Sequence, residues 1–96
     1  MTRAEVRAWL QQRMPAPPPA LAEQLARAVS DSALPLPEHL AEQGRTLLAG
    51  VLAHPEGGRV LALQLLAADA FVTYACEAQA EADTFGLDAL ARKIAT

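Results

Sequence analysis

The sequence predicts a small all-α protein, a bundle of four to five helices around a long central apolar helix at about residues 58–82. The first observation is the segment 60–76, VLALQLLAADAFVTYAC, in which apolar residues occupy most of a helical circumference. A surface helix has one apolar stripe, so we expect the rest of the chain, or a second copy of it, to wrap this helix. The second observation is that no segment alternates polar and apolar residues with the period of a strand.

The composition predicts one domain, residues 1–96, with a core of leucine and alanine. Apolar residues make up 52% of the chain, but aromatic residues only 4%. A buried Leu contributes about 1.5–3 kcal/mol and a buried Ala much less, so an alanine-rich core of this size has little margin. A partner would supply further apolar contact. We therefore expect self-association, as a homodimer, or binding to another protein.

The first helix is expected from Thr2 to about Met14. The sequence Thr2-Arg3-Ala4-Glu5 has the pattern of a capping box, and Pro15 ends the helix. The apolar face at helical spacing consists of Val6, Trp9, Leu10 and Met14. Residues 15–19 are proline-rich and are expected to form a stiff connector rather than a ligand for another protein. Trp9 and Leu10 are candidate interface residues, and a place for Trp9 in the core is the alternative.

Two further helices precede the central one. The second is expected to begin at Pro18 or Pro19, since proline is favoured in a first turn, and to stop near Ser30. The third is expected from about Glu38 to His54. A glycine inside a helix costs up to about 1 kcal/mol relative to Ala, so Gly44 predicts a close crossing with another helix. The apolar stripes are Leu21, Leu25 and Val29 in the second helix, and Leu40, Gly44, Leu47, Leu48, Val51 and Leu52 in the third.

The central helix follows a turn and is expected from about Gly58 to Ala82, roughly 36 Å at 1.5 Å per residue. A last short helix is expected after Asp83-Thr84. Its buried residues would be Leu87, Leu90 and Ile94.

Three polar residues of the central helix form a candidate ligand-binding site: Asp69, Thr73 and Glu77. Their i, i+4, i+8 spacing places them on one face. A buried ionised Asp requires a partner, so a buried polar seam here would meet a ligand, a metal or an arginine. The alternative is that this face of the helix meets solvent.

The other polar residues form no catalytic or metal-binding set. Glu38, His39 and Glu42 lie within one helical turn, but a di-iron bundle requires Glu-x-x-His pairs on two helices. The single cysteine, Cys76, cannot form an internal disulfide or a thiolate zinc cluster. No serine stands at a recognisable spacing from a histidine. We expect no metal site, no cofactor and no enzymatic activity.

The net charge of −3 disfavours binding to a phosphate backbone, so nucleic acid is not an expected partner. Arginines on the first helix, Arg3, Arg7 and Arg13, keep a DNA-binding regulatory protein as an alternative. The N-terminus has no apolar signal segment, and Gln64 and Asp69 interrupt an apolar run shorter than the roughly 20 residues that span a bilayer. We expect a cytoplasmic protein without a membrane segment.

Together these observations predict a small cytoplasmic helical module for protein–protein interaction, or an accessory subunit. A small-ligand or metal-binding bundle that uses the polar seam is the first alternative, and DNA binding is the second.

Overall fold

The computed structural model of the protein describes residues 1–54, 56–82 and 87–95. These residues form five α-helices and no strand: α1 (Arg3–Gln11), α2 (Pro19–Ala28), α3 (Leu36–Leu52), α4 (Arg59–Ala82) and α5 (Leu87–Ala95). The all-α fold predicted from the sequence is confirmed, including the long helix that packs against the others.

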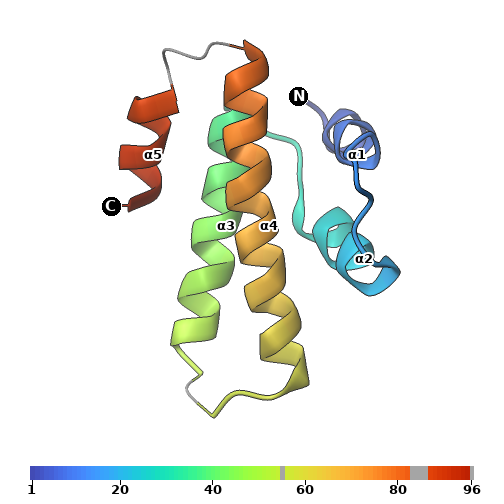
Figure 1. Ribbon diagram of the computed structural model, residues 1–96, viewed down its shortest axis with the longest axis vertical. Helices are drawn as coiled ribbons and strands as arrows, with labels where there is room; N and C mark the ends of the chain where they lie inside the picture. Colours follow the sequence, from blue (N-terminus) through green and yellow to red (C-terminus); the bar gives the residue numbers. More distant parts are fainter. Residues whose placement is uncertain (55, 83–86, 96) are drawn as a thin grey trace.

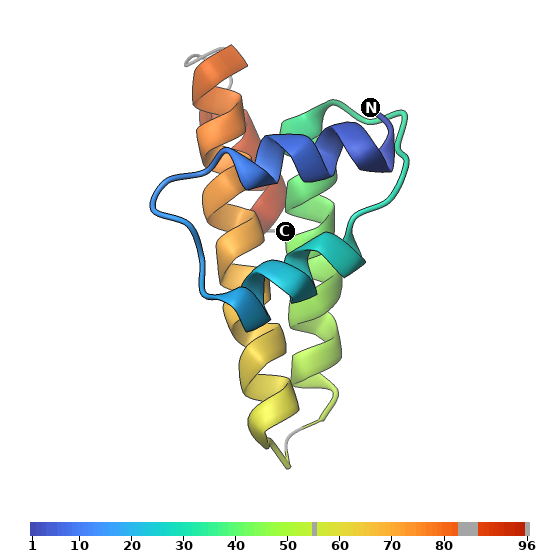
Figure 2. The same cartoon turned by 90° about the vertical axis from the view of Figure 1, so that its right-hand side faces the viewer.

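The helices form three layers. In the middle layer α3 and α4 make an antiparallel hairpin that spans the long axis of a molecule 39 Å in length (Figure 1). On one face of this hairpin α1 and α2 lie side by side and cross both long helices (Figure 2). On the opposite face α5 packs near the end where α3 begins and α4 ends, and it stops well short of the α3–α4 turn (Figure 1).

Local chemistry determines both ends of α1. The Thr2 hydroxyl accepts a hydrogen bond from the Glu5 N–H at 3.2 Å, and the Thr2 N–H donates to the Glu5 carboxylate at 2.8 Å, so the predicted capping box is confirmed. The helix ends at Gln11, before the predicted end at Met14, and Met14 precedes a proline, a position at which the helical conformation is disfavoured. The predicted burial of Met14 is wrong, since this side chain is 85% exposed.

Prolines begin the next two helices. Pro19 is the first residue of α2, as predicted. The third helix starts at Leu36, slightly earlier than expected, because Pro37 is tolerated in a first turn, where its missing N–H donor is not required. At the other end of α2, Arg7 Nε donates to the Ala26 carbonyl oxygen at 3.0 Å, and a cation is favoured beside these unpaired carbonyls.

Small residues allow α3 and α4 to pack closely. A Cβ atom added at Gly44 would lie 3.0 Å from Val72 Cγ2 and 3.2 Å from the Ala68 carbonyl oxygen, so the predicted close crossing is confirmed. The buried residues of α4 are Ala67, Ala68, Phe71, Ala75 and Ala78. The face of α4 that enters the core is therefore mostly alanine.

Contrary to the sequence-based expectation, the chain does not wrap α4 along its whole length. Burial begins at Ala67, whereas Leu65, Leu66 and Val60 are 48%, 56% and 70% exposed. The reason is the arrangement of the short helices. Because α1 and α2 cross the hairpin, each covers α4 over little more than the width of one helix (Figure 2). The 9 residues of α5 extend only about 14 Å beside an α4 of about 36 Å. The end of α4 near the turn stays uncovered.

Candidate interaction surface

The uncovered end of the α3–α4 hairpin, residues 45–54 and 56–69, is called the distal hairpin below. Its turn uses Gly57 and Gly58, whose φ angles of 72° and 115° are disfavoured for residues with a side chain. The last turn of α3 is closed by His54, whose Nδ1 lies 2.9 Å from the Gly50 carbonyl oxygen. A defined turn therefore holds the two helices side by side at this end.

An apolar groove, the distal groove, runs between α3 and α4 on the face that also carries α5. Leu48 and Leu52 line it from α3, and Leu61 and Leu65 line it from α4. The i, i+4 spacing within each helix puts the two leucine pairs in line along the groove. Leu48, Leu52 and Leu65 are 43%, 72% and 48% exposed. Three large apolar side chains thus face solvent on one surface of the molecule.

The distal groove consists of two adjoining hollows that share Leu65. One, of about 210 Å³, lies next to α5 and is bounded there by Val72 and Ile94. The other, of about 400 Å³, reaches the turn at Gly57 and Gly58. The groove therefore begins where α5 ends and continues to the tip of the hairpin.

Charged residues stand at both ends of the distal groove. Arg45 of α3 and Asp69 of α4 line the end near α5. Arg45 makes only a long i, i+3 ion pair with Glu42, at 3.9 Å, and its side chain is 47% exposed. Glu56 and Arg59 are exposed at the turn. Each end of the groove thus carries one acidic and one basic side chain.

The predicted polar seam lies on the outer, solvent-facing side of α4. Asp69 and Thr73 are exposed, and the Thr73 hydroxyl donates to the Asp69 carbonyl oxygen at 3.0 Å. Glu77 is 47% exposed and lies 3.7 Å from the guanidinium of Arg13. These positions match the alternative in which this face of the helix meets solvent. The three side chains are not buried, so they do not require a ligand as a partner.

Trp9 belongs to a cluster that attaches α1 to α4. Its ring meets the Tyr74 ring edge to face, with centroids 6.2 Å apart, and the Arg13 guanidinium carbon lies 3.8 Å from the Trp9 ring centroid. Trp9 Nε1 and Arg13 Nη1 both donate to the Glu81 carboxylate, at 3.3 and 2.7 Å. The hydrogen bond from Arg13 lowers the pKa of Glu81, while burial raises the pKa of Tyr74. Leu10, the other candidate interface residue, is 9% exposed and packs in the core of the chain.

The residues considered for a metal site do not converge on one point. His39 is 4% exposed, and its Nε2 is buried without a hydrogen-bond partner in the described part of the chain. Burial is the main cause that lowers the pKa of His39. Among residues 1–54, 56–82 and 87–95, no group of three or more His, Cys, Asp or Glu side chains could hold a metal ion. Cys76 is half-buried on α4.

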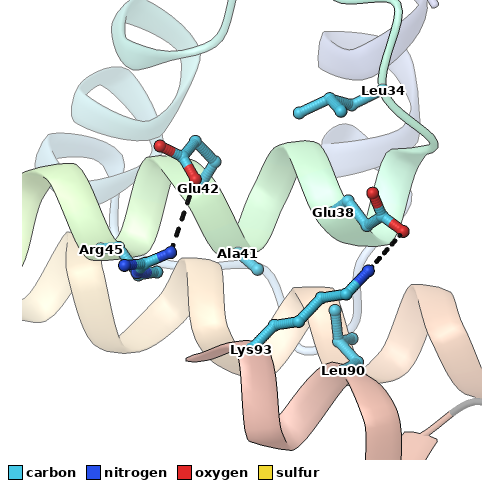
Figure 3. Close-up of a pocket in the computed structure, with 7 residues that line it drawn as sticks. All are labelled: Leu34, Glu38, Ala41, Glu42, Arg45, Leu90 and Lys93. Carbon is cyan, nitrogen blue, oxygen red and sulfur yellow. Dashed lines mark hydrogen bonds and ion pairs between the residues drawn. The ribbon is translucent and has the colours of Figure 1, made fainter. Parts of the chain in front are cut away.

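A separate hollow of about 220 Å³ lies between α3 and α5 (Figure 3). Its charged side chains form ion pairs, with Lys93 Nζ 3.1 Å from Glu38 and Arg45 3.9 Å from Glu42. The apolar part of its wall is Leu34, Ala41 and Leu90. Pockets that bind small molecules usually measure about 300–1,000 Å³, so this hollow is small for a ligand site.

The arginines that raised the possibility of DNA binding contact the protein itself. Arg3 Nη2 lies 3.5 Å from the same Ala26 carbonyl oxygen that Arg7 contacts. The Arg13 side chain is 14% exposed within the Trp9 cluster. These residues hold α1 against α2 and α4.

Helix α4 has the length and hydropathy to cross a membrane, and no other helix in the described residues does. The core helix of a soluble bundle passes the same test. The exposed face of α4 carries Asp69 and Glu77, and a charge near the middle of a membrane helix costs about 2.5–3.5 kcal/mol. Length and hydropathy alone are therefore only weak evidence for a membrane segment.

The sequence does not predict the distal groove. Helical spacing places Leu48 and Leu52 in a buried stripe and predicts that residues 60–66 are wrapped by other helices. The signal that could have revealed the groove is the predicted length of the short helices, which is too small to cover a helix of about 36 Å.

Comparison with models of protein families, with curated proteins and with solved structures finds no match for this chain.

Proposed function

We propose that this protein is a helical interaction module, or an accessory subunit, that binds a protein partner through the distal groove. The observation that carries this proposal is the row of exposed leucines, Leu48, Leu52 and Leu65, on one face of the hairpin. Contiguous exposed apolar surface is typical of sites where proteins associate. A cytoplasmic location, expected from the sequence, is part of the same proposal.

The exposed leucines of the groove supply a modest part of the binding free energy. Covering a half-exposed leucine contributes about 1 kcal/mol, so the three leucines and the partly buried groove walls contribute roughly 4 kcal/mol on this side of an interface. A partner with an equally apolar surface roughly doubles this value. Because association itself costs about 4–15 kcal/mol, these apolar contacts supply only part of the affinity, and polar and charged contacts at the ends of the groove must supply the rest.

The two alternatives from the sequence have less support. A small-ligand or metal site would need the seam Asp69, Thr73 and Glu77 to be buried or to converge with other ligands, and these side chains are exposed. DNA binding would need free arginines on α1, and Arg7 and Arg13 are occupied in contacts within the chain.

The test is quantitative affinity purification with tagged wild-type protein and a Leu48→Gln/Leu65→Gln double variant. Ala8→Gln, an exposed site on α1, is the matched control. Light scattering of the purified proteins shows whether the partner is a second copy, and circular dichroism shows that each variant is folded.

The proposal expects a partner that wild type and the Ala8→Gln control both retain and that the double variant loses. Equal retention of every partner by the double variant would contradict it, as would a wild-type protein that binds neither itself nor another protein.

A further inference from the structure

The space beside α5 limits what can occupy the distal groove. On this face of the hairpin α5 fills the outer layer from the beginning of α3 to Ile94, and the layer is open from there to the turn (Figure 1). The open part faces residues 45–52 of α3 and 59–69 of α4, which extend about 12 and 16 Å. An occupant must therefore be about 15 Å long, apolar on one side and able to lie end to end with α5.

The distal hairpin of a second copy meets these conditions. It has the same length, and its own apolar side is the distal groove. A two-fold interface is made by one patch on both copies, so the patch must complement itself. Each helix of the groove offers two leucines one turn apart, so a two-fold pairing centred between them places Leu48 opposite the partner's Leu52 and Leu61 opposite the partner's Leu65.

Only the antiparallel orientation fits the layers. A parallel pair would bring the two α5 helices, which lie on the same face of each copy, into the same space. In an antiparallel pair the tip of each hairpin lies at the open end of α5 of the other copy. In that pairing α3 packs on α3 and α4 on α4, so the two distal hairpins form a four-helix bundle.

Charge favours the same orientation. Antiparallel docking places the turn of one copy, with Glu56 and Arg59, at the α5 end of the other, with Arg45 and Asp69. Because α3 lies on α3, Glu56 comes beside Arg45 of the second copy. Because α4 lies on α4, Arg59 comes beside Asp69 of the second copy. All four contacts in the pair then join opposite charges.

We propose that two copies of this chain associate through their distal grooves as an antiparallel two-fold pair, with Arg45 of each copy facing Glu56 of the other. This inference rests on the proposed function and identifies the partner as the protein itself.

Sedimentation equilibrium of wild type and charge-reversal variants tests this pairing. Glu56→Arg and Arg45→Glu each place two like-charged pairs in the interface and are expected to raise the dimer Kd about fivefold or more. The double variant restores opposite charges and is expected to return the Kd to within about twofold of wild type. Glu23→Arg, at an exposed site on α2, is the control and should leave the Kd unchanged. Thermal unfolding shows that all four variants are folded.

Two results would overturn the proposal: a wild-type protein that stays monomeric up to a concentration of about 0.5 mM, or a dimer whose Kd is unaffected by the single reversals. The wild-type protein could be monomeric while the Leu48→Gln/Leu65→Gln variant loses a different protein in the affinity purification. That result would refute a second copy as the occupant of the groove, but it would support the proposed interaction module. A monomer without any partner would refute both.

Discussion

At the scale of single residues, two glycines of α3 stand in opposite surroundings. A Cβ at Gly44 would meet Val72 Cγ2 at 3.0 Å and a backbone carbonyl oxygen of α4 at 3.2 Å, whereas a Cβ at Gly50 would meet nothing within 4 Å. Gly44→Ala is expected to lower the free energy of unfolding by about 1–3 kcal/mol. Gly50→Ala is expected to raise it by up to about 1 kcal/mol, because alanine favours the helix. Chemical denaturation measures both, and equal effects would contradict the close crossing.

His39 gives stability a pH dependence. Burial, and to a smaller extent the nearby N-terminal ammonium, lowers the pKa of His39 in the folded protein. As pH falls below the ordinary value of about 6.5, the unfolded chain takes up a proton that the folded protein does not, so the free energy of unfolding decreases. Glu5 and Glu81 have lowered pKa values in the folded protein. They affect stability at lower pH than His39 does, because their stabilising contribution is lost only as pH falls below the ordinary range of a carboxyl.

The expected outcome is a decline in stability between about pH 7 and pH 5 that His39→Leu abolishes. Urea denaturation at several pH values measures this difference. The exposed His54 is present in both proteins and serves as an internal control. An unchanged pH dependence in the variant would refute the assignment to His39.

At the scale of elements, Trp9 and Arg13 attach α1 to α4 through their contacts with Tyr74 and Glu81. Arg13→Ala removes the guanidinium from the Trp9 ring and is expected to cost about 1 kcal/mol of stability. Because Trp9 is the only tryptophan, its fluorescence reports the docking of α1 directly, and the emission should shift to the red. Arg27→Ala is the control, because Arg27 is exposed and its Nη2 donates to Gln24 of the same helix at 3.1 Å. The same emission in both variants would contradict the role of Arg13.

The order and approximate bounds of the helices could be predicted because local signals determine them. Thr2 and Glu5 form the predicted cap, and the proline at position 19 begins α2 as expected. The close approach at Gly44 was also predictable, since a helix tolerates glycine in its interior at a cost that packing must offset.

The distribution of exposed surface was not predicted because periodicity does not show how far a neighbouring helix extends. The leucines at 48, 52 and 65 have helical spacing typical of a core, yet α5 borders their groove only at Ile94, and it stops well short of the α3–α4 turn (Figure 1). The polar stripe at 69, 73 and 77 is compatible with burial or exposure, and the positions of α1 and α5 decide that it faces solvent.

At the scale of the whole molecule, the protein has two unequal halves. One half buries the alanine-rich face of α4, with Phe71 and Leu40 fully enclosed. The other half, the distal hairpin, is held by the contact between two helices and exposes its largest apolar side chains. An isolated helical pair buries little surface, so we expect this half to have the lower local stability until a partner covers it.

Hydrogen–deuterium exchange at low and high protein concentration tests the central claim most directly, because it locates the associating surface on the chain. We expect the amides of residues 45–54 and 56–69 to gain protection at high concentration, while α1 and α2 exchange at the same rate under both conditions. Exchange that is independent of concentration throughout the chain would contradict self-association through the distal hairpin, and so would protection gained at α1 or α2.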